Sequence, residues 1–315
     1  MFGRFFKTVS VVNFSLGSNE TVEASELAEK VKMLAHTPIK PSQKESVGFT
    51  SIISYHDPEL LIHTVDRFIF LTVTYEFKKV NQLKVERLLS AKKKEVAKKN
   101  NIDVDELADQ EIEEIRERIK MDELQKASPA EDVCNIIIDS DTARVYFSVM
   151  ATTVIAKKAV GLLQKCYPSL KVHPFAPQTV EASLTQWVYK PSDKLPDRFS
   201  LGNEIALKSE NDSRAKLQKQ DLGSMEVTTM IDHGKLVHEV ATVYQDRVGF
   251  VLTNQCFLRK ATPLDLYYDG VDYEGINPDS YIDTYTRDWI MLCSWLTDFY
   301  EWLTITLQIP KIEYS

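Results

Sequence analysis

Two aspartates, Asp139 and Asp141, follow an apolar run and could hold a divalent metal ion. Carboxylates at this spacing can bind Mg²⁺ for phosphoryl chemistry, which would make the chain a metal-dependent exonuclease. The same residues suit a hairpin turn, because Asp side chains bond to nearby backbone groups. No lysine or third carboxylate stands at a recognisable nuclease spacing. We favour the turn and keep the exonuclease as an alternative function.

Residues for other kinds of catalysis are scarce. His56, Asp57 and His63 are close in sequence and suit acid–base chemistry, but no Ser or Cys stands in a nucleophile context. The chain has no H-E-x-x-H motif and no glycine-rich phosphate loop. Its four cysteines are far apart in apolar runs, which predicts buried thiols and neither zinc nor disulfides. We predict a protein that is not an enzyme, with no metal and no cofactor.

Residues 214–220 have the composition of a phosphate-binding strand. In an extended conformation Lys216, Gln218 and Gln220 share one face, and Lys219 lies on the other. Lysine supplies charge and glutamine supplies amide donors, which suits DNA contacts that do not depend on sequence. An exposed edge strand whose lysines deter aggregation has the same pattern. From these residues alone the two interpretations are equally good.

A second basic segment runs from residue 78 to residue 99, where lysine and arginine far outnumber acids. Acids dominate 103–132, and the whole chain has a formal net charge of −8. This segregation of charge allows a positive surface on an acidic protein. Its candidates for contact with nucleic acid are Lys84, Arg87 and Lys92.

The hydrophobic pattern predicts an α+β fold with mixed antiparallel sheets. Residues 81–126 contain no Gly or Pro and predict two helices, at about 82–99 and 103–126. Their apolar positions are sparse, so we expect a projecting arm. Other helices are expected at 21–34, 151–166, 180–190, 224–233 and 279–307, and strands at 4–16, 61–77, 134–149, 214–220 and 235–253. We expect 1–80 and 133–180 to form a central α/β body, 81–132 the arm, and 181–315 a base domain with the C-terminal helix.

The predicted helix at 279–307 is apolar beyond a single stripe. A helix of this kind is either deeply buried or shared with another subunit. We favour a homodimer contact through Trp289, Leu292, Leu296 and Phe299.

No stretch of the chain reaches the length of an apolar membrane span. The N-terminal residues alternate and lack the uninterrupted apolar region of a signal peptide. We therefore predict a cytoplasmic protein without a membrane partner.

Two further segments are SLTQWV at 183–188 and KQDLGSMEVTTMIDHGKLVHEVATVYQDRVGFVLT at 219–253. They resemble the core signature of the RdgC family of recombination-associated proteins. The segments ELAEKVKMLAHTPIKPSQKESVGF and LIHTVDRFIFL and the lysine-rich helix follow one another in the family's order. One stretch, 121–132, departs from the family's basic-aromatic segment, because it has no Arg and no aromatic residue. The resemblance covers nearly the whole chain but not this segment, which helps to close a ring in the family.

The resemblance implies a subunit of a ring-shaped homodimer that encircles double-stranded DNA without sequence preference. It further implies association with the nucleoid and an effect on homologous recombination through limited access of the recombinase, a second partner. Lys219 and Gln220 fall on the family's Lys-Gln pair implicated in DNA contact, Lys92 on a family lysine in the long helix, and Lys216 on a basic position upstream. A protein-interaction module that binds no DNA is the remaining alternative.

Overall fold

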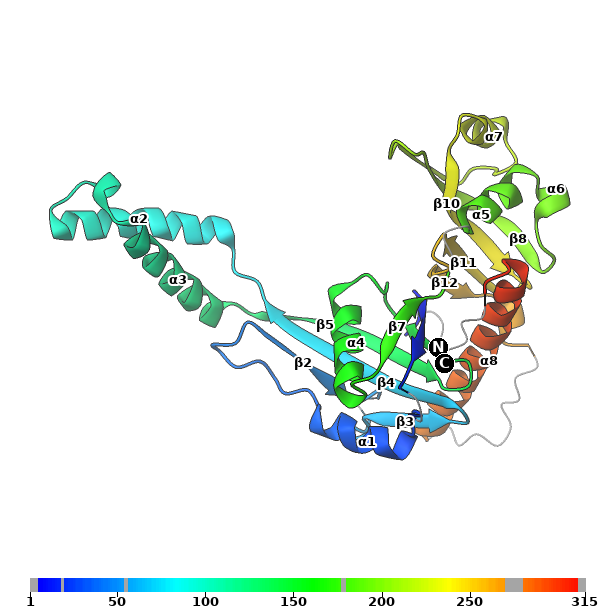
Figure 1. Cartoon of the computed structure of the whole chain (residues 1–315), viewed down its shortest axis with the longest axis horizontal. Helices are drawn as coiled ribbons and strands as arrows, with labels where there is room; N and C mark the ends of the chain where they lie inside the picture. The colour runs from blue at the N-terminus through cyan, green and yellow to red at the C-terminus, as the bar shows by residue number, and fades with distance from the viewer. Residues whose placement is uncertain (1–4, 18–19, 54–55, 177–179, 270–279, 311–315) are drawn as a thin grey trace.

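The chain folds into two antiparallel sheets, a helical arm and one long C-terminal helix (Figure 1). This is a computed structural model, and it describes residues 5–17, 20–53, 56–176, 180–269 and 280–310. The α+β class, the antiparallel sheets and the arm agree with the prediction. None of the described helices is long and apolar enough to cross a membrane.

The first sheet has the strand order β2-β4-β5-β6-β1-β7, with β3 beside β4. Its strands are β1 (Ser10–Ser15), β2 (Glu45–Thr50), β3 (Ile62–Val65), β4 (Phe68–Lys78), β5 (Pro129–Asp139), β6 (Arg144–Phe147) and β7 (Lys171–Pro174). β4 and β5 pair along their whole length, so the chain leaves the sheet at Lys78 and returns opposite it at Pro129. The predicted hairpins at 61–77 and 134–149 are confirmed, and β5 begins earlier than expected.

Both faces of the first sheet are covered, which explains the continuous apolar runs in β4 and β5. Ile69, Leu71 and Ile136 belong to a core with α1 (Ala24–Met33) and α4 (Val154–Cys166). Phe70 and Ile137, on the opposite face, belong to a second core that contains the C-terminal helix. Neighbouring residues of one strand thus belong to different cores.

The second sheet has the order β12-β11-β10-β8-β9. Its strands are β8 (Phe199–Lys208), β9 (Arg214–Gln218), β10 (Leu236–Tyr244), β11 (Val248–Thr253) and β12 (Leu258–Pro263). The helices of this region are α5 (Val180–Tyr189), α6 (Pro191–Lys194) and α7 (Met225–Asp232). Short 3-10 turns, η1 (Val104–Glu106) and η2 (Asp265–Tyr267), complete the described elements. Helix α7 follows Ser224 and ends just before Gly234, close to the predicted range 224–233.

The long helix α8 (Tyr281–Thr306) lies between the two sheets (Figure 1). Trp289 stacks on Phe70 of the first sheet, with ring centroids 4.8 Å apart. Phe299 meets Phe250 of the second sheet at 5.2 Å. A helix that serves two sheets needs apolar residues on two sides, which accounts for its broad apolar surface. It therefore contacts both sheets.

The arm consists of α2 (Gln82–Asn100) and α3 (Asp109–Lys126), which pack on each other and project from the first sheet (Figure 1). Few of its side chains are buried, and those of α2 are Val85, Leu89 and Ala97. Between the two helices, Asp103 caps the turn η1. The arm and the second sheet stand at opposite ends of a bent molecule.

Candidate nucleic-acid interface

Strand β9 presents the polar side chains that the sequence singles out. Ala215 and Leu217 pack against the core, whereas Lys216 and Gln218 are exposed. The predicted alternation stops at Gln218, because the next residue, Lys219, has a φ of 56°. This left-handed conformation is uncommon for a residue with a Cβ atom. Lys219 is exposed like Gln218 and does not lie with the packed side chains.

Lys219 places an exposed ammonium group directly after β9. Within the described residues, Lys219 has no ion pair and no side-chain hydrogen bond. The backbone pairing resumes immediately afterwards, where the Gln220 amide donates to the Asn203 carbonyl at 3.2 Å. The backbone next to Lys219 is therefore fixed by strand pairing, and its side chain is exposed.

Gln220 is fixed to the start of helix α7. Its Nε2 donates to Glu226 Oε2 at 3.2 Å and to Ser224 Oγ at 3.5 Å. Ser224 occupies the N-cap position of this helix but accepts no capping bond from the helix backbone. Gln220 is half-buried, and its side-chain amide links the end of β9 to helix α7. It was predicted to share a face with Lys216, but the turn at Lys219 separates them.

Lys216 belongs to a charge cluster centred on Glu204 of β8. Lys216 Nζ lies 3.0 Å from Glu204 Oε1, and Lys260 Nζ of β12 lies 2.5 Å from Oε2. The hydrogen bond from Lys260, with further bonds from Lys216 and Gln218, outweighs burial and lowers the pKa of Glu204 to about 2. Sequence analysis did not identify Glu204 or Lys260, because no spacing rule connects residues so far apart.

The arm carries the second set of predicted contacts. Lys84 pairs with Glu123 of α3, which also meets Lys126 at 3.4 Å. Lys92 Nζ lies 2.8 Å from Glu95, one turn further along α2. Arg87 is exposed and has no ion pair within the described residues. The predicted residues at the end of β9 thus contact different neighbours, and the arm residues lie far from them, at the other end of the molecule (Figure 1).

Asp139 and Asp141 lie in the β5–β6 turn. Asp139 is fully buried, and its Oδ1 accepts backbone N–H groups of Asp141 at 3.2 Å and Thr142 at 3.3 Å. Its carboxylate also meets Arg67 Nε at 3.1 Å, and Asp141 meets Arg67 Nη1 at 3.5 Å. Both oxygens of Asp139 are thus engaged by the protein. The described residues contain no cluster of three His, Cys, Asp or Glu that could hold a metal ion. The geometry supports the turn and gives no support to a metal site at this pair.

The four residues predicted at a dimer interface lie inside the chain. Trp289 has 2% of its surface exposed, Leu296 1%, and Leu292 and Phe299 none. Trp289 packs on Phe70, and Phe299 packs on Tyr244 and Phe250, all aromatic residues of this chain. This corrects the prediction, because side chains covered by their own chain offer no surface to a second one. The apolar pattern of 279–307 reflects the two-sheet core.

The remaining candidates for catalysis have structural surroundings. His63 Nε2 lies 3.1 Å from Thr286 Oγ1, and burial lowers the pKa of this histidine. His56 stacks on Tyr281 at 3.6 Å. Cys134, Cys166, Cys256 and Cys293 are buried and free, and burial raises the pKa of each thiol. Protonated, buried thiols are poor nucleophiles.

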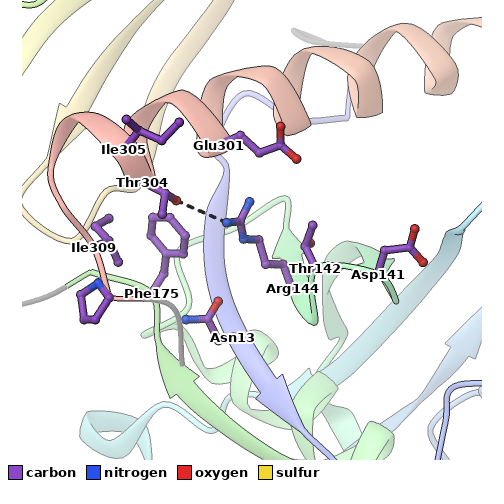
Figure 2. Close-up of a pocket in the computed structure, with 10 residues that line it drawn as sticks. Asn13, Asp141, Thr142, Arg144, Phe175, Glu301, Thr304, Ile305 and Ile309 are labelled. Carbon is purple, nitrogen blue, oxygen red and sulfur yellow. Dashed lines mark hydrogen bonds between the residues drawn. The ribbon is translucent and has the colours of Figure 1, made fainter. Parts of the chain in front are cut away.

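A pocket of about 500 Å³ lies beside the C-terminal end of α8 (Figure 2). Arg144 stands in it, with Nη2 donating to Thr304 Oγ1 at 3.3 Å and the guanidinium 5.2 Å from the Phe175 ring. Asp141 and Glu301 also line it, from the hairpin turn and from α8. The described lining residues of the pocket include one cation and two carboxylates, and neither a histidine nor a cysteine is among them.

Comparisons with known proteins agree with the order of segments in the sequence. A family model described as "Putative exonuclease, RdgC" matches residues 4–309. The "Recombination-associated protein RdgC" of Bordetella parapertussis is 25% identical over 283 residues, which are 89% of this chain and 91% of the relative. The protein of the same name from Yersinia enterocolitica is 27% identical over 304 residues, 92% of this chain and 93% of the relative. The chain belongs to the RdgC family.

Proposed function

We propose that this protein binds double-stranded DNA without sequence preference and thereby limits the access of a recombinase to that DNA. The observation that carries the proposal is the end of β9, where Lys219 is exposed without an ion pair among the described residues and Lys216, three residues before it, shares Glu204 with Lys260. Ammonium groups contact phosphates and read no bases, so binding of this kind is independent of sequence. The relatives are named as recombination-associated proteins, which supports a role in recombination.

The arm supplies a second basic surface in this proposal. Lys84 and Lys92 keep exposed ammonium groups despite their acidic partners, and Arg87 is exposed. The arm and the second sheet rise from opposite ends of the bent chain, so a duplex between them would meet positive charge from both (Figure 1). We propose that a homodimer completes this clamp around DNA, and that the protein works at the nucleoid without a cofactor.

Occupancy is the proposed mechanism of interference with recombination. A duplex held along its phosphates is less available to a recombinase filament, whatever its sequence. This mechanism requires no chemical step on the DNA. It agrees with the Asp139 carboxylate, which is already bonded to Arg67 and to the backbone N–H of Asp141.

A double variant at the strand end tests the proposal. The variant Lys219→Ala with Gln220→Ala removes the unpaired ammonium group and one side-chain amide. Alanine keeps the Cβ atom of lysine, so the substitution adds no steric strain to the left-handed backbone at position 219. We expect duplex binding to weaken by about eightfold or more at 0.1 M salt, the effect of about one lost phosphate contact. Fluorescence anisotropy with a labelled duplex measures it, and Lys157→Ala on α4 is the control for net charge. Equal affinity of the double variant and the control would contradict the proposed site.

A further inference from the structure

Glu204 connects the two edges of the second sheet. Its partners Lys216 and Lys260 belong to β9 and β12, which are the edge strands of this five-stranded sheet. In a flat sheet β12 would lie three strand spacings from β8, about 14 Å away. Direct contact between Lys260 and Glu204 therefore requires the sheet to curl. The carboxylate is largely covered, with 14% of its side chain exposed, whereas each lysine is about half exposed, 49% and 55%.

The backbone of β12 directs Lys260 into this cluster. The pairing of β12 with β11 passes from Thr262 opposite Gly249 to Arg259 opposite Val251, so two residues of β12 face one residue of β11. Lys260 lies at this bulge and has a φ of 55°, close to the 56° of Lys219. Bulges of this kind redirect a side chain and recur beside functional sites. Lys260 thus reaches Glu204 from β12, and Lys216 reaches it from β9, three residues before the left-handed Lys219.

We propose that Lys260 is a further DNA-contacting residue, part of one phosphate site with Lys216 and Lys219, and that Glu204 positions its lysines and moderates its affinity. This inference rests on the proposed DNA-binding function and adds to it a strand that the sequence did not indicate. Each ammonium group has three N–H donors, so a lysine can keep its bond to Glu204 and still donate to a phosphate. Three lysines and one glutamate leave two positive charges at the site.

A purely structural role makes a different prediction. If Lys260 and Glu204 only fasten the sheet edges together, removing either lowers stability and leaves the salt dependence of DNA binding unchanged. If Lys260 contacts phosphate, its removal releases about one counterion fewer on binding. The two roles are therefore separated by measuring unfolding and salt dependence on the same variants.

The test measures the affinity of four variants for a labelled duplex by fluorescence anisotropy over a range of salt concentrations. In each variant one charged side chain is replaced by neutral glutamine. Lys260→Gln should weaken binding about eightfold at 0.1 M salt and reduce the slope of log K against log salt by about 0.9. Glu204→Gln should strengthen binding and steepen that slope. Lys158→Gln and Glu45→Gln, which break a lysine–glutamate pair by the first sheet, are the matched controls and should change little. Lys260→Arg keeps the charge and should retain binding.

Four outcomes decide between these roles. The inference would be overturned if Lys260→Gln had the same slope of log K against log salt as Lys158→Gln. It would also be overturned if Glu204→Gln bound the duplex more weakly than Glu45→Gln. If the wild type binds and Lys219→Ala weakens it while Lys260→Gln does not, only the role of Lys260 falls. A wild-type protein that binds no duplex at any salt would remove the proposed function itself.

Discussion

Single side chains in this protein show how burial decides which charges are available. Asp139 is buried and bonded to Arg67 and to two backbone amides, so it stabilises a turn. Lys219 is exposed and, among described residues, unpaired, so it can meet a ligand. The two were both sequence candidates, and only contacts across the fold separate them. Burial without a partner is costly for a charge, which is why Asp139 has several partners.

Replacement of Asp139 by asparagine should destabilise the protein. Arg67 would lose its buried partner, at a cost of about 2–3 kcal/mol in the free energy of unfolding. The matched variant Asp141→Asn removes a carboxylate with 62% of its side chain exposed and should cost less than about 0.5 kcal/mol. Urea unfolding measures both. Equal losses in the two variants would show that the turn is not held as described.

Glu204 gives a prediction on pH. Its folded pKa of about 2 is below the ordinary 4.5, so its interactions stabilise the fold above pH 4.5 and are lost as the pH falls toward 2. Glu204→Gln should therefore be less stable than wild type near neutral pH, with a difference that shrinks between pH 4.5 and pH 2. Unfolding at a series of pH values measures this. A difference that is constant over that range would contradict the ion-pair cluster.

At the scale of elements, the sequence predicts best what is periodic or continuous. Helices α2 and α3 follow from good helix formers without Gly or Pro, and β4 and β5 from long apolar runs bounded by turns. The short strands β2, β7 and β12 have no such pattern and were not predicted. Their residues become strands because neighbouring strands offer hydrogen bonds, which one sequence does not display.

The same limit explains the errors at the candidate site. Helix α8 has the apolar surface of an interface helix, but that surface is used by two sheets of its own chain. Lys260 and Glu204 meet only because the second sheet curls, and nothing in their local sequence indicates it. Lys219 and Gln220 were identified through the family's motif, and the left-handed conformation of Lys219, directly after β9, was not predicted.

The arm should open independently of the body, since few of its side chains are buried. Leu89→Ala removes a side chain with 3% exposure from the α2–α3 contact, where such losses cost about 2–5 kcal/mol. We expect faster hydrogen exchange within residues 82–126 and unchanged exchange in β4 and β5 below the point where the arm leaves. The neighbouring Leu88→Ala, at 39% exposure, is the control and should have little effect. Faster exchange throughout the first sheet would instead indicate that arm and body unfold together.

For the whole molecule, an acidic protein with a formal net charge of −8 is proposed to bind a polyanion. This is consistent because attraction to phosphate depends on the local potential, and the proposed contact residues lie on helix α2 of the arm and on the outer strands of the second sheet. The bend places these regions at opposite ends of the chain (Figure 1). Affinity in such a system comes from release of counterions and is steeply dependent on salt.

The most direct test of the account is the salt dependence of duplex binding by the wild-type protein on two DNA duplexes of unrelated sequence. We predict equal affinities for the two duplexes and a linear fall of log K with log salt, with a slope of about −0.9 for each phosphate neutralised. Several contacts from Lys216, Lys219, Lys260 and the arm should make that slope markedly steeper than −2. An affinity that is independent of salt, or confined to one of the two sequences, would contradict the central claim.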